Sequence, residues 1–129
     1  MLLVEDNETN RDMLSRRLVR HGFEVLCAVD GPSAVTSALR ERPDVILMDV
    51  ALGETMDGWE ATLAIKAAKE TARIPIIALT AHALESDRAR SVEVGCCDFD
   101  TKPVDLPRLL GKINARLVAA TGQRTGSQR

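Results

Sequence analysis

Five polar side chains come directly after short apolar stretches of the sequence. They are Glu5, Asp6, Asp49, Thr80 and Lys102. Three carboxylates that lie close together repel one another, so each has a raised pKa or needs a neighbouring cation. Carboxylate oxygens suit a hard ion such as Mg²⁺, which prefers one or two carboxylates and keeps several waters. If the fold brings these residues together, their chemical types predict a Mg²⁺ site.

The other two groups extend this chemistry to phosphoryl transfer. Lys102 supplies a positive charge, and the hydroxyl of Thr80 can donate a hydrogen bond to a phosphoryl oxygen. Together with a metal ion they would stabilise the charge on a phosphoryl group during transfer. Asp49 is the natural nucleophile, and its attack would form an acyl phosphate. Each residue alone has an ordinary structural explanation, such as an acid near a helix N-terminus, so the prediction depends on the set.

The apolar stretches predict the elements that position these residues. Strand-like runs are expected at Met1–Val4, Phe23–Ala28, Val45–Asp49, Ile76–Leu79 and Cys97–Thr101. A helical segment follows each run. The first begins after Asn7 and ends at Gly22, and the second begins at Asp30–Pro32 and ends before Pro43. The other three are expected at about 59–71, 85–94 and 105–119.

Five strand–helix repeats favour an α/β domain whose parallel sheet has helices on both faces. Right-handed crossovers leave few topologies, and we expect the flavodoxin-like, doubly wound (βα)5 fold with strand order 2-1-3-4-5. In that order strands one and three are neighbours at the point where strand order reverses. Glu5, Asp6 and Asp49 then share one crevice, with Thr80 and Lys102 on the same rim.

Helical spacing also predicts which apolar side chains face the sheet. The expected buried residues are Met13, Leu14 and Leu18 in the first helix, Ala34, Val35, Ala38 and Leu39 in the second, Leu63 and Ile65 in the third, and Leu109, Leu110, Ile113 and Leu117 in the last.

Composition bounds the remaining possibilities. The 129 residues fit one domain at 1–120, followed by a polar tail at 121–129 that we expect to be disordered. A net charge of −2 and an aromatic content of 2% argue against direct nucleic-acid binding. Three cysteines without a CxxC pattern favour a reducing cytoplasm. No signal peptide is recognisable, and no apolar run is long enough to cross a membrane.

From residue 1 to about residue 119, the sequence resembles the receiver domain of two-component response regulators. The resemblance lies in the segments LLVEDNETN, PDVILMDV, MDGWEA, PIIALTAHA and GCCDFDTKP. It implies that Asp49 accepts a phosphoryl group from a phosphohistidine of a histidine kinase or histidine phosphotransfer protein. A receiver domain promotes its own phosphorylation and dephosphorylation, has no separate substrate, and switches a surface that binds a downstream protein.

The resemblance also implies roles for single residues. Asp6, Asp49 and the backbone carbonyl of Ala51 would bind Mg²⁺, for which Mn²⁺ can substitute, and Glu5 would hold a metal-bound water. Lys102 and Thr80 would bind the phosphoryl oxygens, and the small Ala81 would leave room for them. Thr80 would move inward, and Phe99 would repack at the aromatic switch position. The Lys102–Pro103 bond would be cis.

Two positions depart from the family pattern. Gly53 stands near the usual proline, and Asp57 and Gly58 come one residue later than expected, which indicates an insertion at Gly53–Thr55. Phe99 has no hydroxyl, so its switching would act through packing alone.

Other functions fit less well. An aspartyl-nucleophile phosphohydrolase of the haloacid-dehalogenase type needs a second acid where Ala51 stands, and the length leaves no room for a cap domain. A flavodoxin needs a better phosphate cradle than Asn7–Thr9 and aromatic residues beside the flavin. A pseudo-receiver that only binds proteins would not need every chemical position. The chain is either a stand-alone receiver or part of a hybrid kinase.

Overall fold

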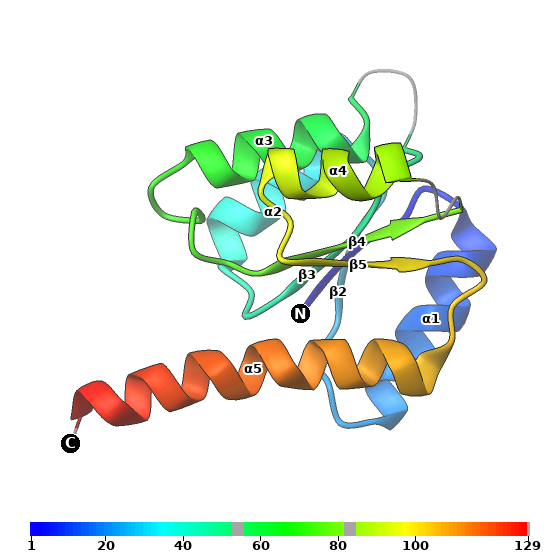
Figure 1. Cartoon of the computed structure of the whole chain (residues 1–129). Coiled ribbons are helices and arrows are strands. Elements are labelled where there is room, and N and C mark those ends of the chain that lie inside the picture. Colours follow the sequence, from blue (N-terminus) through cyan, green and yellow to red (C-terminus); the bar gives the residue numbers. More distant parts are fainter. Residues whose placement is uncertain (53–55, 82–84, 129) are drawn as a thin grey trace.

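A five-stranded parallel sheet forms the centre of the molecule, with strand order β2-β1-β3-β4-β5 (Figure 1). The computed structural model describes residues 1–52, 56–81 and 85–128. The strands are β1 (Leu2–Val4), β2 (Leu26–Ala28), β3 (Ile46–Asp49), β4 (Ile76–Thr80) and β5 (Asp98–Thr101). The order confirms the flavodoxin-like topology that the sequence predicts.

Helices cover both faces of this sheet (Figure 1). They are α1 (Glu8–Arg20), α2 (Gly31–Glu41), α3 (Gly58–Ala67), α4 (Glu85–Val94) and α5 (Leu106–Gln128). Each face has its own aliphatic core, because successive strand residues point to opposite sides. On one side α2, α3 and α4 pack over residues such as Val4, Met48 and Ala78. On the other, α1 and α5 pack over residues such as Leu47 and Leu79.

The first three helices begin at capping side chains placed just after a strand or its loop. Asn7 accepts a hydrogen bond from the backbone N–H of Asn10 at 2.9 Å. Asp30 accepts one from Ser33 at 2.8 Å within a capping box, and Asp57 accepts one from Glu60 at 2.9 Å. These bonds satisfy N–H groups that the first helical turn leaves open. They fix where each chain segment leaves the carboxyl edge of the sheet.

Three predictions of burial were wrong. Met13, Leu39 and Leu63 are 56%, 39% and 47% exposed. Each is next in sequence to a better-buried residue, and one residue turns the side chain by about 100° around the helix axis. The buried stripes are therefore narrower than the runs of apolar letters suggest. Strand β2 is also shorter than predicted, since it begins at Leu26 rather than Phe23.

Helix α5 differs most from its predicted length. We expected it to end near Ala119, but it continues to Gln128, and its end extends beyond the sheet in Figure 1. Residues 121–128 contain two glycines but no proline, so no ring interrupts the i→i−4 hydrogen bonds. The division of the chain into a domain at 1–120 and a tail at 121–129 stays a prediction.

A close backbone contact joins the start of α3 to the end of β3. The N–H of Gly58 donates to the carbonyl of Val50 at 3.1 Å. A Cβ atom on Gly58 would lie 2.3 Å from the carbonyl oxygen of Asp49 and 2.6 Å from the Cα of Val50. Neither is a flexible side-chain atom that could move aside. Only glycine therefore fits where α3 meets the backbone that carries Asp49.

We expect Gly58→Ala to lower the free energy of unfolding by about 2 kcal/mol or more, because the new methyl group overlaps backbone atoms. Urea denaturation measures this. Gly111→Ala is the matched control, since an added Cβ there meets nothing within 4 Å. It should raise stability by about 0.5–1 kcal/mol, because alanine favours a helix interior. Equal effects of the two substitutions would contradict the contact.

Candidate functional site

Three carboxylates meet at the carboxyl edge of the sheet, between β1 and β3. One carboxylate oxygen each from Glu5, Asp6 and Asp49 lies within 4.8 Å of the others. The parallel pairing of Val4 with Met48 causes this, since the residues after both strands emerge side by side. Glu5 and Asp49 are only 5% and 2% exposed, whereas Asp6 is open to solvent. The predicted acidic crevice is present.

Lys102, the residue after β5, completes the cluster. Its ammonium Nζ lies 2.9 Å from Oε1 of Glu5 and 3.0 Å from Oδ2 of Asp49. The backbone N–H of Lys102 donates to the carbonyl of Thr80 at 2.7 Å, which ties this position to the end of β4. The Lys102–Pro103 bond is cis, as the resemblance implies. Three carboxylates against one ammonium leave a net charge of −2, which one divalent cation would balance.

The environment shifts two pKa values in this cluster. Burial raises the pKa of Glu5, and the neighbouring Asp49 carboxylate raises it further, against the opposing effect of Lys102. Burial also acts to lower the pKa of Lys102, but its hydrogen bonds to Glu5 and Asp49 outweigh this, and the pKa is raised. Lys102 therefore stays charged at neutral pH, and a nearby cation would favour the charged form of Glu5.

Backbone groups hold the two buried acids in place. The Oδ1 atom of Asp49 accepts a hydrogen bond from the N–H of Ala51 at 3.1 Å. The Oε2 atom of Glu5 accepts one from the N–H of Asn7 at 3.3 Å, and Arg11 donates to the carbonyl of Glu5 at 3.0 Å. Each carboxylate thus has one oxygen on the backbone and the other on Lys102. This arrangement fixes both side chains before any ligand arrives.

Thr80, Ala81 and Phe99 lie on the neighbouring strands. Thr80 ends β4 and is 1% exposed, and Ala81 follows it at the surface. The register pairs Asp49 with Leu79 and Ala78 with Phe99. Paired residues of parallel strands share a face, and so do residues two apart on one strand. Thr80 and Phe99 therefore lie on the same side of the sheet, beneath α4.

Sequence reasoning missed two contributors to this geometry. Gly58 was noted only as part of a motif, yet it sets how closely α3 approaches the backbone of Asp49. Arg11 was not singled out, because no pattern in the sequence predicts its hydrogen bond to the carbonyl of Glu5. The predicted insertion at Gly53–Thr55 lies outside the described residues.

Comparison with known proteins identifies the family. A family model described as the response regulator receiver domain matches residues 1–114. The chain belongs to this family. It is similar to the protein PilH of Pseudomonas aeruginosa, with 38% identity over 117 residues that cover 91% of this chain and 96% of PilH. It is also similar to the polar-differentiation response regulator DivK of Brucella anthropi, with 36% identity over 91% of this chain and 94% of DivK.

Solved receiver structures have the same fold. The receiver domain of the sensor histidine kinase PA1611 from Pseudomonas aeruginosa superposes with a TM-score of 0.83 at 40% identity, covering 90% of this chain and 94% of that one. That structure has a magnesium ion coordinated in its active site cleft. Vibrio cholerae CheY4 gives a TM-score of 0.84 at 31% identity, covering 90% of this chain and 96% of its own.

Membership of the receiver family confirms the predicted function as a phosphoryl-accepting signal switch. Receiver domains are signal-transduction modules, which distinguishes this chain from the flavodoxin and phosphohydrolase alternatives. Within the described residues, no helix is both long and apolar enough to cross a membrane.

The raised pKa of Glu5 predicts how the stability of the metal-free receiver depends on pH. The folded protein holds the Glu5 proton more tightly than the unfolded chain does. Its stabilising contribution is therefore complete below the ordinary pKa of 4.5 and is lost as pH rises through the raised value. In chelator-containing buffer, the unfolding free energy of the wild type should fall relative to that of Glu5→Gln as pH rises from about 4.5 to neutrality.

Urea denaturation over this pH range provides the measurement. Asp44→Asn is a suitable control, because Asp44 is exposed near the opposite end of β3. A difference between wild type and Glu5→Gln that stays constant with pH would contradict the electrostatic account.

Proposed function

We propose that Asp49 is the phosphoacceptor and that a phosphohistidine is the donor. The observation that carries this is the buried Asp49 carboxylate, held by Lys102 at 3.0 Å within the Glu5–Asp6–Asp49 cluster. An oxygen of Asp49 attacks the phosphorus, a P–O bond forms, and the P–N bond to the donor imidazole breaks. The electron pair of that bond returns to the imidazole nitrogen.

The donor set of the crevice fits Mg²⁺. Three carboxylate oxygens within 4.8 Å of one another, with a net charge of −2, offer the hard ligands that this ion prefers. Asp6, Asp49 and the backbone carbonyl of Ala51 would hold it, and Glu5 would bind it through a water molecule. A bound Mg²⁺ supplies positive charge to the phosphoryl oxygens. Mn²⁺, which also takes oxygen ligands, would serve as a substitute.

The remaining residues act on the phosphoryl group and its consequences. Lys102 exchanges its contact with Asp49 for one with a phosphoryl oxygen. Thr80 turns toward the same group, and Ala81 leaves room for it. Phe99, on the same side of the sheet as Thr80, then repacks and alters the surface formed by α4, β5 and α5. This is a shift in population between two arrangements of the domain.

The partners follow from this chemistry. A histidine kinase or histidine phosphotransfer protein supplies the phosphoryl group, and docking beside α1 brings its histidine to the crevice. A downstream protein reads the switched surface. A cytoplasmic location and the absence of direct nucleic-acid or membrane binding stay predictions from composition.

We expect the wild type to gain the mass of one phosphoryl group when it is incubated with acetyl phosphate or phosphoramidate and Mg²⁺. The labelled fraction of Asp49→Asn should be at least about tenfold lower than that of the wild type, since an amide cannot act as the nucleophile. Intact-protein mass spectrometry measures both. Asp44→Asn, which removes an exposed acid outside the crevice, should label like the wild type. Full labelling of Asp49→Asn would rule out the assignment.

We expect Mg²⁺ to raise the melting temperature, because it binds only the folded crevice. Mg²⁺ at tenfold its dissociation constant stabilises by about 1.4 kcal/mol, which corresponds to several degrees for a domain of this size. Thermal melts with and without millimolar Mg²⁺ test this. Asp6→Asn should lose most of the gain while it keeps the fold, since Asp6 is exposed. An equal gain in wild type and Asp6→Asn would place the ion elsewhere.

A further inference from the structure

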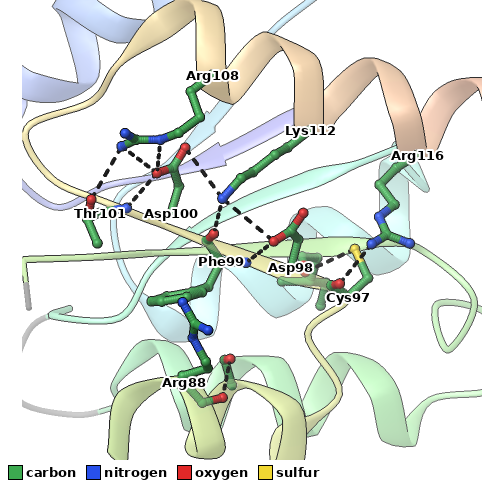
Figure 2. Close-up of polar contacts among 11 residues, drawn as sticks. Arg88, Cys97, Asp98, Phe99, Asp100, Thr101, Arg108, Lys112 and Arg116 are labelled. Atoms are coloured by element: carbon green, nitrogen blue, oxygen red, sulfur yellow. Dashed lines mark hydrogen bonds and ion pairs between the residues drawn. The ribbon is translucent and has the colours of Figure 1, made fainter. Parts of the chain in front are cut away.

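The ring of Phe99 lies between two cations that come from different helices. The guanidinium Cζ of Arg88, on α4, is 5.1 Å from the ring centroid, and Nζ of Lys112, on α5, is 5.9 Å from it. Both distances lie within the roughly 6 Å over which a cation is attracted to an aromatic face. Figure 2 shows α4 on one side of β5 and α5 on the other. Side chains from the helices on both faces of the sheet thus contact the ring of Phe99.

The position of β5 makes this contact possible. It is the last strand of the sheet, so α5 can reach around its free edge. Lys112 donates to the carbonyl of Phe99 at 2.5 Å, and Arg116 donates to that of Cys97 at 3.0 Å (Figure 2). Four residues of helix advance about 6 Å and two residues of strand about 6.6 Å, so the two spacings match. This match fixes the register of α5 along β5.

The two cations are held differently. Lys112 also lies 3.7 Å from the carboxylate of Asp98 and 3.9 Å from that of Asp100. The side chain of Arg88 forms no ion pair with a carboxylate among residues 1–52, 56–81 and 86–118, and its guanidinium contacts the ring. Lys112 is therefore held in place by a carbonyl and two carboxylates of β5. The attraction of each cation to the ring depends on where the ring lies.

A cavity of about 310 Å³ opens beside the ring, between α4 and β5. Arg88, Val92, Phe99 and Lys112 are among its lining residues. The ring therefore borders this cavity and also packs against the aliphatic core under α4. Because a cation–π attraction weakens with distance, these two contacts favour the ring position that the structure shows.

We propose that Arg88 and Lys112 are positioning residues for the switch. Their cation–π contacts hold Phe99 in the position that the structure shows and oppose the repacking that accompanies phosphorylation. This inference rests on the proposed function, because that function assigns the switch to Phe99. One such contact changes the ratio of the two ring positions by about threefold. By linkage, loss of the contact tightens binding of a phosphoryl mimic by up to the same factor.

The chain offers a direct observation of the ring, because it contains two phenylalanines, Phe23 and Phe99. Incorporation of phenylalanine with a carbon-13 ring gives two sets of NMR signals. Phe23 is half-buried, packs against the core on the α1–α5 side and serves as the internal reference. Spectra are recorded without additions and during titration with beryllofluoride in the presence of Mg²⁺. Beryllofluoride stands in for the phosphoryl group on the aspartate.

Three variants separate the contact from its alternatives. Arg88→Met removes the charge and keeps an apolar stem, whereas Arg88→Lys keeps a cation. Arg90→Met removes a charge from the same helix, where Arg90 lies 4.0 Å from Glu93. Before any addition, Arg88→Met should move the Phe99 signals toward their beryllofluoride positions. Its half-saturating beryllofluoride concentration should fall by about threefold. Arg88→Lys and Arg90→Met should match the wild type, and Phe23 should be unchanged.

The possible failures are distinguishable. If the wild-type Phe99 signals respond to beryllofluoride but Arg88→Met gives wild-type signals and half-saturation, the positioning role is overturned and the proposed function stands. An equal response in Arg90→Met also overturns it, because the effect is then one of net charge. If Phe99 in the wild type does not respond to beryllofluoride with Mg²⁺, the proposed switch is overturned, and the role of Arg88 and Lys112 with it.

Discussion

The contact of one ammonium with two buried carboxylates is the constraint on which the site depends. Lys102 reaches both Glu5 and Asp49, which leave the sheet from different strands. Without this cation, two acids that are almost fully buried would face each other in a poorly solvated crevice, which is costly. With it, the crevice still carries an excess of negative charge. That balance leaves a clear electrostatic reason to bind a divalent cation.

The rest of the fold places these three groups within reach of one another. Parallel pairing of β1 with β3 puts the acids side by side, and the hydrogen bond from Lys102 to the carbonyl of Thr80 positions the lysine. Gly58 lets α3 begin directly against the backbone of Asp49. On the far side of β4, the edge strand β5 carries Phe99 between α4 and α5. The acidic crevice and the surface beside Phe99 are therefore separated by β4.

Local sequence patterns predicted the parts of this arrangement that depend on local chemistry. An apolar run followed by an acid identified Asp49 at a strand end, and the predicted helix starts after Asn7 and at Asp30–Pro32 were confirmed. The predicted burial of Met13 and Leu63 was wrong, because an apolar residue type alone does not show which side of a helix faces the sheet. The approach of Gly58 to Asp49 and of Arg88 to Phe99 arises only when successive helices and strands pack against each other. No local pattern in the sequence contains that information.

A crystal structure of the protein with Mg²⁺ and beryllofluoride tests the central claim most directly. The account predicts beryllofluoride on the carboxylate of Asp49 and Mg²⁺ bound by Asp6, Asp49 and the carbonyl of Ala51. It also predicts that the ammonium of Lys102 contacts a fluorine atom. Beryllofluoride on any other side chain, or Lys102 turned away from an occupied Asp49, would contradict the account.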